Sequence, residues 1–455
     1  MAKTPLIAVI QFPGVNTEYE TRREIDAAGM KGEFFRWNEE AKRLSKFDGF
    51  ILPGGFSYED RGRAGLVAAL EPIMGAIREQ SEKGKPVLGI CNGAQMAMET
   101  GMVPGAENYK LAMALARNRR IKDNQVLGTG YYNDWIYIKH TASKGRTAFT
   151  INIEDGEVLY MPVAHGEGRF VTAVEGLLDQ LIHNQQTVFR YCDKSGSINN
   201  EFPVNPNGSL YNLAAVCNPD GNVMSIMPHH ERSLVSEKFF TSMRDYILGA
   251  KLNRPKISRL KVSPPDPMLK EPYSPPSGAM QFFVDLVITD NEADTIEHAV
   301  CKLGLSNVRL ARRTHFEIGL QDKVDSKALA KKIIQSGLLL NTNKEAVTMK
   351  AGRETLRFKK ESGTWIPLEK ASNSGVSYDF SLLAREKQDL FGLAKTNTAH
   401  GRLKMDGVTH IKRGIIWNIS VDSKSQKEKE RVFKKLMSYN VFTNPHYGHV
   451  QTIGS

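Results

Sequence analysis

The sequence predicts an α/β fold in its first half, followed by two small α+β units. Three observations carry this prediction. Short apolar strands alternate with helices across residues 1–250, as in parallel sheets with helices on both faces. A proline-rich stretch at 251–280 then interrupts the pattern. Beyond this stretch, a similar order of strands and helices occurs twice, which indicates a duplicated α+β unit.

The elements of the first half follow one another in a regular order. We expect strands at 6–12, 32–37, 47–52 and 86–90, and helices at 18–28, 66–81 and 94–100. Ligand chemistry in open α/β sheets lies at the carboxyl ends of the strands. The residues that follow Phe12, Leu52 and Ile90 are therefore the first candidates for a functional site.

The segment 251–280 is expected to be a stiff, extended linker, because it contains seven prolines and little periodic apolar signal. The domains are thus expected at 1–250, 281–350 and 376–455. In each later unit we expect strands and helices at similar spacing. The predicted elements of the first are strands 282–288, 308–320 and 346–349 with helices 294–303 and 326–340. Those of the second are strands 376–383 and 408–421, a helix at 426–439 and an extended segment at 446–452.

Charge is distributed unevenly along the chain. Residues 1–250 contain 27 Lys and Arg against 29 Asp and Glu, a net charge of −2, whereas residues 251–455 contain 34 against 21, a net charge of +13. A basic second half is compatible with an acidic protein partner, phosphorylated ligands or nucleic acid, and also with a plain solvated surface.

The sequence also excludes several classes of protein. No apolar run approaches the ~18 residues of a membrane helix, and the apolar start is too short for a signal peptide. We therefore expect a cytoplasmic protein. The cysteines form no CxxC pair, so neither a disulfide framework nor a metal site is predicted. They are Cys91, Cys192, Cys217 and Cys301.

Cys91 has the setting of a nucleophile. It follows the strand 86–90 within the pattern Gly89-x-Cys91-x-Gly93, and a helix comes next. Small residues on both sides permit the sharp strand-to-helix turn of a nucleophile elbow. The same turn places the thiol at a helix N-terminus, where backbone N–H groups favour a negative charge.

A nucleophilic cysteine needs a base, and two His-x-Glu motifs could supply it. The first contains His165 and Glu167 in a glycine-rich loop, which suits contact with a substrate or partner. The second contains His229 and Glu231 after an apolar strand, where a rigid scaffold can hold an imidazole. Spacing alone does not choose between them. His230 is expected to be a solvent-facing neighbour.

Backbone N–H groups near Cys91 could form an oxyanion hole. Gly54 and Gly55 follow the strand 47–52, and glycines allow the backbone to approach a ligand closely. Together with the N–H of Asn92, this turn could bind a tetrahedral oxyanion. An ordinary Gly-Gly turn is the simpler alternative.

Eight motifs in order give the first half a specific resemblance. They are Phe12-Pro-Gly-Val-Asn16, Leu52-Pro-Gly-Gly-Phe-Ser-Tyr58, Arg63-Ala-Gly65, Gly89-Ile-Cys-Asn-Gly93, Ala164-His-Gly-Glu-Gly-Arg169, Val188-Phe-Arg-Tyr-Cys-Asp193, Asn205-Pro-Asn-Gly-Ser209 and Met227-Pro-His-His-Glu-Arg232. Residues 1–250 resemble the glutaminase subunit of phosphoribosylformylglycinamidine synthase, a class I glutamine amidotransferase. The resemblance implies a Cys91–His229–Glu231 triad that releases ammonia from L-glutamine, with His165 outside the triad.

Four positions depart from the family pattern. His230 stands where proline is usual, Ala94 where phenylalanine is usual, Glu59 where glycine is usual and Thr17 where cysteine is usual. None of these departures removes a member of the implied triad.

Residues 281–350 and 376–455 resemble, more weakly, the small accessory subunit of the same synthase. The family implies that a large subunit receives the ammonia and binds ATP and Mg²⁺, so that this chain holds no cofactor. Two other classes stay open. One is a cysteine hydrolase on the same fold, such as an intracellular peptidase or glyoxalase-like protein. The other is a non-catalytic assembly or nucleic-acid-binding protein, although no aromatic RNA-binding signature is present.

Overall fold

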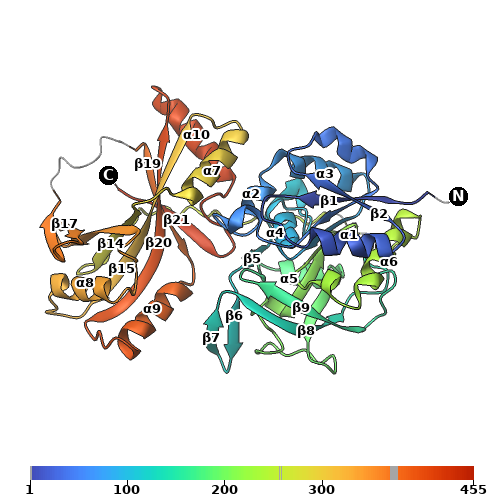
Figure 1. Cartoon of the computed structure of the whole chain (residues 1–455), viewed down its shortest axis with the longest axis horizontal. Helices are drawn as coiled ribbons and strands as arrows, with labels where there is room; N and C mark the ends of the chain where they lie inside the picture. The colour runs from blue at the N-terminus through green and yellow to red at the C-terminus, as the bar shows by residue number, and fades with distance from the viewer. Residues whose placement is uncertain (1–2, 256, 258, 369–377, 455) are drawn as a thin grey trace. The chain divides into compact units, whose positions relative to one another are not determined.

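The computed structural model describes residues 3–255, 257, 259–368 and 378–454, and the chain divides into two compact units. The first unit is Met1–Pro265 and the second is Asp266–Ser455. Each unit has its own sheet (Figure 1). Among the described residues, no helix combines the length and the apolar character that a membrane span requires.

The first unit is built on a large sheet that, in the described part of the chain, has nine strands in the order β2-β1-β3-β4-β13-β12-β11-β8-β9. The strands are β1 Leu6–Gln11, β2 Lys31–Arg36, β3 Gly49–Leu52, β4 Val87–Ile90, β8 Tyr132–His140, β9 Val158–His165, β11 Thr187–Cys192, β12 Leu213–Cys217 and β13 Val223–Ile226. The pairings from β2 to β13 are parallel, and those from β13 to β9 are antiparallel. The α/β fold class is confirmed, with an antiparallel extension.

Helices follow the parallel strands β1, β3 and β4, as the sequence predicts. They are α1 Glu18–Ala27, α2 Leu66–Ala69, α3 Pro72–Glu82 and α4 Asn92–Glu99, and α5 Leu177–His183 and α6 Ser236–Ile247 are additions to the prediction. The single helix expected at 66–81 is two helices, because the chain leaves helical geometry at Glu71 before Pro72. Proline has no N–H for the preceding turn, so it begins a helix more readily than it continues one.

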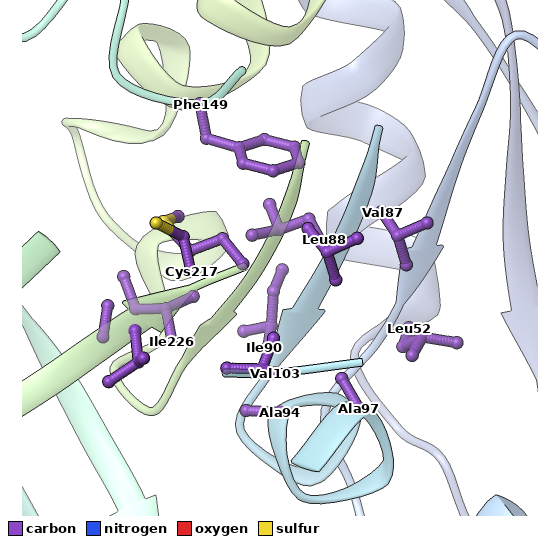
Figure 2. Packing of buried hydrophobic residues seen from close by; sticks show 14 of the residues in the cluster. Leu52, Val87, Leu88, Ile90, Ala94, Ala97, Val103, Phe149, Cys217 and Ile226 are labelled. Atoms are coloured by element: carbon purple, nitrogen blue, oxygen red, sulfur yellow. The ribbon is translucent and has the colours of Figure 1, made fainter. Parts of the chain in front are cut away.

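The core of the first unit lies between the central strands and the helices. Figure 2 shows Ile90 of β4 packed near Ala94 and Ala97 of α4, with Ile226 of the neighbouring strand β13 close by. These side chains are fully buried. Burial of a large aliphatic side chain contributes about 1.5–3 kcal/mol, so this packing fixes the position of the β4–α4 turn.

The second unit contains one antiparallel sheet that, within the described ranges, has eight strands in the order β18-β17-β16-β14-β15-β20-β19-β21. Its strands are β14 Met280–Leu286, β15 Val308–Leu320, β16 Glu345–Ala351, β17 Glu354–Lys359, β18 Thr364–Pro367, β19 Phe380–Glu386, β20 Val408–Val421 and β21 Gly448–Thr452. Its helices are α7 Asn291–Lys302, α8 Ser326–Gln335, α9 Leu390–Gly401 and α10 Gln426–Ser438.

The order β-α-β-α-β occurs twice in this unit, from β14 to β16 and from β19 to β21. The two copies meet through the long strands β15 and β20, which pair antiparallel from Val308–Val421 to Leu320–Val408. Helix α9 and the strands β17 and β18 are additions to the sequence-based expectation. Val376 and Ser377, which begin one predicted strand and domain, lie outside the described residues.

The proline-rich segment is divided between the two units. Leu260 bridges Ala106 and is buried in the core of the first unit together with Val262. Met268 and Tyr273 form bridges to β21 and the residue after it, in the second unit. Each half of the segment therefore belongs to a folded unit, because its apolar side chains and backbone groups find partners there.

Candidate active site

Cys91 lies in a strained turn between β4 and α4. Its backbone has φ 50° and ψ −105°, a region that non-glycine residues rarely adopt. A Cβ on Gly89 would come within 2.4 Å of the Gly93 oxygen, and a Cβ on Gly93 within 1.9 Å of the Leu52 oxygen. Both glycines are therefore required for the turn, as the elbow pattern predicts.

The surroundings of the Cys91 thiol come from two segments. The thiol lies at the N-terminus of α4, and the Cys91 oxygen accepts hydrogen bonds from the N–H groups of Ala94 and Gln95. The Sγ atom is 3.7 Å from the carbonyl oxygen of Ala164, at the end of β9. The thiol is thus held where N–H dipoles of the helix and a carbonyl from a distant strand meet.

His229 and Glu231 form the only His–carboxylate hydrogen bond among the sequence-predicted site residues, all of which the structure describes. The distance from Nδ1 to Oε1 is 2.6 Å, and both side chains are buried. The backbone N–H of His229 donates to the oxygen of Pro162 in β9. A Cβ on Gly54 would lie 2.7 Å from the imidazole Cε1, so the ring occupies the space beside the Gly-Gly turn.

The charges of this pair stabilise each other. Burial alone would lower the pKa of His229, but the charge of Glu231 and the hydrogen-bonded Cys91 thiol raise it above its usual range. Burial alone would raise the pKa of Glu231, and the His229 imidazole outweighs this and lowers it. The arrangement therefore favours an imidazolium beside a carboxylate, with Cys91 as its third member.

The backbone N–H groups near Cys91 differ in availability. The N–H of Gly54 donates to the Thr17 hydroxyl at 2.8 Å, so that group already has an acceptor. In the part of the chain that the structure describes, the N–H groups of Gly55 and Asn92 have none. Gly55 has φ 140°, and a Cβ there would be 2.6 Å from the Cα of Val15. Gly55 and Asn92 are therefore better placed than Gly54 to bind an oxyanion.

His165 lies beside this site in a different chemical state. The Asn118 Oδ1 accepts from the Gly168 N–H at 2.9 Å, which orients the Asn118 amide so that its Nδ2 faces His165 Nδ1 at 3.1 Å. The same Nδ2 also donates to the oxygens of Gly130 and His165, at 3.1 and 2.7 Å. Burial and the nearby His229 lower the pKa of His165 to about 3, so the imidazole is neutral.

Glu167, the partner of His165 in the first motif, contacts other groups. Its carboxylate Oε2 accepts from the Ala64 N–H at 3.2 Å, and its backbone oxygen accepts from Gln95 Nε2 at 2.6 Å. These contacts connect the loop after β9 to α4 and to the residues before α2. The two His-x-Glu motifs thus have equal spacing but different geometry.

The expectation that His230 faces solvent is wrong. His230 is fully buried, and its ring stacks on Phe239 with centroids 4.2 Å apart and planes at 15°. Burial lowers its pKa to about 4. His230 therefore lies in the core against α6, because its ring packs on an aromatic side chain of that helix.

The other departures from the family pattern have distinct settings. Ala94 is fully buried in the core, and Thr17 binds the Gly54 N–H. Glu59 lies between Tyr58 and Asp60 in a run of three positive φ angles, 51°, 57° and 53°. Such values cost of order 1 kcal/mol or more for each non-glycine residue. Glycine would remove that strain at position 59.

Sequence reasoning missed Asn118 and Asp60. The Asp60 Oδ1 accepts from Asn92 Nδ2 at 3.2 Å, and burial together with Glu167 raises the pKa of Asp60 to about 7. Neither residue has a sequence signal beyond being polar, since their neighbours in the site come from remote parts of the chain.

Among the described residues, no group of three or more His, Cys, Asp or Glu side chains could hold a metal ion.

Comparison with known proteins agrees with the geometry of the first unit. Residues 4–244 match the family model of the CobB/CobQ-like glutamine amidotransferase domain. The chain is 44% identical over 257 residues to phosphoribosylformylglycinamidine synthase subunit PurQ of Methanothrix thermoacetophila. The alignment covers 53% of this chain and 97% of the relative. It is 39% identical over 236 residues to the subunit of the same name from Methanocaldococcus jannaschii, covering 52% and 92%.

A solved structure is also similar to this chain. It is described as the structure of PurLQS from Thermotoga maritima, and the matched chain is 29% identical with a TM-score of 0.42. The match covers 54% of this chain and 100% of that one.

Proposed function

The chain belongs to the CobB/CobQ-like glutamine amidotransferase family over residues 4–244, and on this premise we propose that it is the glutaminase component of phosphoribosylformylglycinamidine synthase. The observation that carries the chemical part of the proposal is the cluster of Cys91, His229 and Glu231 at the β4–α4 turn. The identity with PurQ relatives over nearly their full length supports the choice of pathway.

The first half of the reaction is acylation of the enzyme. The Cys91 thiolate attacks the side-chain amide carbon of L-glutamine, and the N–H groups of Gly55 and Asn92 stabilise the tetrahedral oxyanion. The protonated His229 donates a proton to the departing nitrogen, so ammonia leaves and a glutamyl thioester remains on Cys91. This proton is available because the charge of Glu231 keeps His229 protonated.

The second half is hydrolysis of the thioester. Neutral His229 takes a proton from water, the resulting hydroxide attacks the thioester carbon, and the Cys91 thiolate is expelled. The new carboxyl group releases its proton to solvent as glutamate leaves. The proton that His229 took from water remains on it, so Cys91 and His229 are again an ion pair. Glu231 accepts the Nδ1–H throughout, so it fixes the tautomer that presents Nε2 to the reacting atoms.

The ammonia is used on another subunit. We expect a large subunit to bind ATP and Mg²⁺ and to convert formylglycinamide ribonucleotide to formylglycinamidine ribonucleotide, in the cytoplasm. The second unit, with its net positive charge and duplicated plan, is proposed to act as the accessory module that docks the first unit onto this subunit. No cofactor is assigned to this chain.

Reconstitution tests the proposal directly. The full chain, mixed with the large subunit, ATP, Mg²⁺ and formylglycinamide ribonucleotide, should consume glutamine and form formylglycinamidine ribonucleotide in equal amounts. Glutamate, product and phosphate are measured together. A mixture that uses free ammonia but never glutamine would contradict the proposal.

A further inference from the structure

The β6–β7 hairpin projects from the body of the first unit (Figure 1). It consists of β6 Arg119–Lys122 and β7 Gln125–Thr129, which pair with each other outside the nine-stranded sheet. Asp123 and Asn124 both have positive φ, as two-residue hairpin turns require. Its edge is held by the segment 201–207, because the Phe202 N–H donates to the Ile121 oxygen at 2.7 Å and the Arg119 N–H to the Asn207 oxygen at 2.9 Å.

The hairpin presents apolar side chains to solvent. Val126 is 41% exposed and Leu127 56% exposed, and Leu127 is the additional residue of a β-bulge opposite Arg120 and Ile121. Near the base, the exposed rings of Tyr131 and Phe56 stack with centroids 6.5 Å apart. Exposed apolar and aromatic side chains gathered on one element mark protein interaction sites.

The charges on the hairpin indicate the kind of partner. Its strands and turn contain Arg119, Arg120 and Lys122 against Asp123, and the Glu201 carboxylate accepts from the Asp123 N–H at the turn. Complementary potentials steer association and set its salt dependence. The matching surface is therefore apolar in its centre and acidic at its rim.

The base of the hairpin is fastened to the active site. Asn118 Nδ2 donates to the oxygens of Gly130 and His165, at 3.1 and 2.7 Å, and Asn118 Oδ1 accepts from the Gly168 N–H. The adjacent Ala164 oxygen is 3.7 Å from Cys91 Sγ. A protein bound to the hairpin is therefore connected to the end of β9, which borders the nucleophile.

We propose that the β6–β7 hairpin docks the first unit onto an acidic-rimmed apolar surface of the large ATP-binding subunit. The inference rests on the proposed function, because ammonia released at Cys91 has to reach that subunit. Asn118, the residue before the hairpin, is hydrogen-bonded to His165, next to the Ala164 oxygen that contacts Cys91. Leu127 and Val126 supply the apolar contact, and Lys122 with its basic neighbours faces the acidic rim.

Two matched full-length variants test this inference. Leu127→Asp places a charge at the hairpin bulge, and Leu248→Asp makes the same change at a leucine that is 54% exposed after α6. Affinity for the large subunit is measured by isothermal titration calorimetry. Leu127→Asp should weaken binding at least tenfold, roughly the effect of losing one central interface residue, and Leu248→Asp should bind like the unmodified chain.

A third variant and two controls complete the experiment. Lys122→Glu should weaken binding in low salt and approach the unmodified chain in high salt, as for a rim charge. Thermal unfolding and glutamine hydrolysis by each chain alone show that the variants are folded, and neither should change. Binding by Leu127→Asp that equals the Leu248→Asp value would overturn the inference.

The controls also separate this inference from the proposed function. If the unmodified chain neither binds the large subunit nor supports glutamine-dependent synthesis, both fail. If it supports synthesis and Leu127→Asp does so with unchanged affinity, only the hairpin inference fails. A Leu127→Asp chain that sediments as a smaller species than the unmodified chain, with unchanged affinity for the large subunit, identifies a second copy as the occupant and overturns it as well.

Discussion

The Nδ1 atom of His229 and the Oε1 atom of Glu231 are 2.6 Å apart, and both side chains are almost completely buried. A carboxylate this close to a buried imidazole fixes the tautomer of the ring and stabilises its protonated form. Cys91 is the other hydrogen-bonding neighbour of His229. The His229–Glu231 pair can therefore exchange protons with the thiol and with the substrate that the thiol attacks. The following predictions rest on this relationship and on its surroundings.

Cys91→Ala should abolish glutamine-dependent synthesis by the reconstituted complex and leave ammonia-dependent synthesis intact. The thiol is needed only to release ammonia, so free ammonia bypasses it. Product formation with each nitrogen source gives the measurement. Equal loss of both activities would contradict the division of labour between the two subunits.

An electrophilic glutamine analogue should label Cys91 and leave the other cysteines unmodified. Burial raises the pKa of the Cys192 and Cys217 thiols, and Cys301 is exposed in the second unit and belongs to none of the active-site sequence motifs. Reactivity follows the thiolate and access to it. Peptide mapping by mass spectrometry locates the label, and recovery mainly on another cysteine would remove Cys91 from its proposed role.

His229→Ala should reduce glutamine turnover by at least about 10²-fold, the scale of losing a general acid–base. His165→Ala should retain part of the hydrolysis and chiefly impair coupling to the large subunit, since the neutral His165 contacts Asn118 rather than a carboxylate. Glutaminase assays with and without the large subunit separate the two effects. Greater damage to hydrolysis from His165→Ala would move the base to the first motif.

His230→Phe should make the chain less sensitive to acid. The folded-state pKa of His230 is about 4, below the ordinary value of 6.5, because burial disfavours the imidazolium. The unfolded chain therefore takes up a proton first, and stability falls as the pH drops from about 6.5 to 4, by on the order of 3 kcal/mol.

Phenylalanine cannot be protonated, so the acid-dependent loss should shrink in His230→Phe. Denaturant unfolding of both chains at pH 8 and pH 5 provides the comparison. At pH 8 the free energies of unfolding should agree to within about 1.5 kcal/mol, the usual range for a near-isosteric core change. An equal loss of stability at pH 5 in both chains would show that His230 is not the titrating group.

Residues 1–265 and 266–455 should fold as separate proteins. A chain that ends at Pro265 keeps Leu260 and Val262 in the first core, and a chain that begins at Asp266 keeps the bridges of Met268 and Tyr273 to the second sheet. The 1–265 protein should hydrolyse glutamine but lose most of its affinity for the large subunit.

The 266–455 protein should be a monomer, because β15 and β20 already pair within one chain. Analytical ultracentrifugation and pull-down with the large subunit provide the measurements. Undiminished binding by 1–265 would contradict the docking role of the second unit. Strong dimerisation of 266–455 would show that the internal pairing leaves a further sheet surface open.

The sequence by itself determined the order of strands and helices and the position of the elbow. Apolar periodicity is a local property, so alternation between 6 and 100 was sufficient to predict the parallel part of the sheet. Gly89 and Gly93 are recognisable in the sequence because this type of turn leaves no room for a Cβ at either position. The same two glycines are therefore expected wherever such a turn occurs. The nucleophile could therefore be predicted from its local pattern.

Only the tertiary structure decided how remote residues meet. Both His-x-Glu motifs have the same spacing, and the backbone turn after β13 sets His229 against Glu231, whereas the loop after β9 sets His165 against Asn118. Burial of His230 depends on α6, which begins six residues later. Such contacts form when segments remote in the sequence pack together and exclude water. The local sequence around a histidine therefore does not predict which residues it will contact.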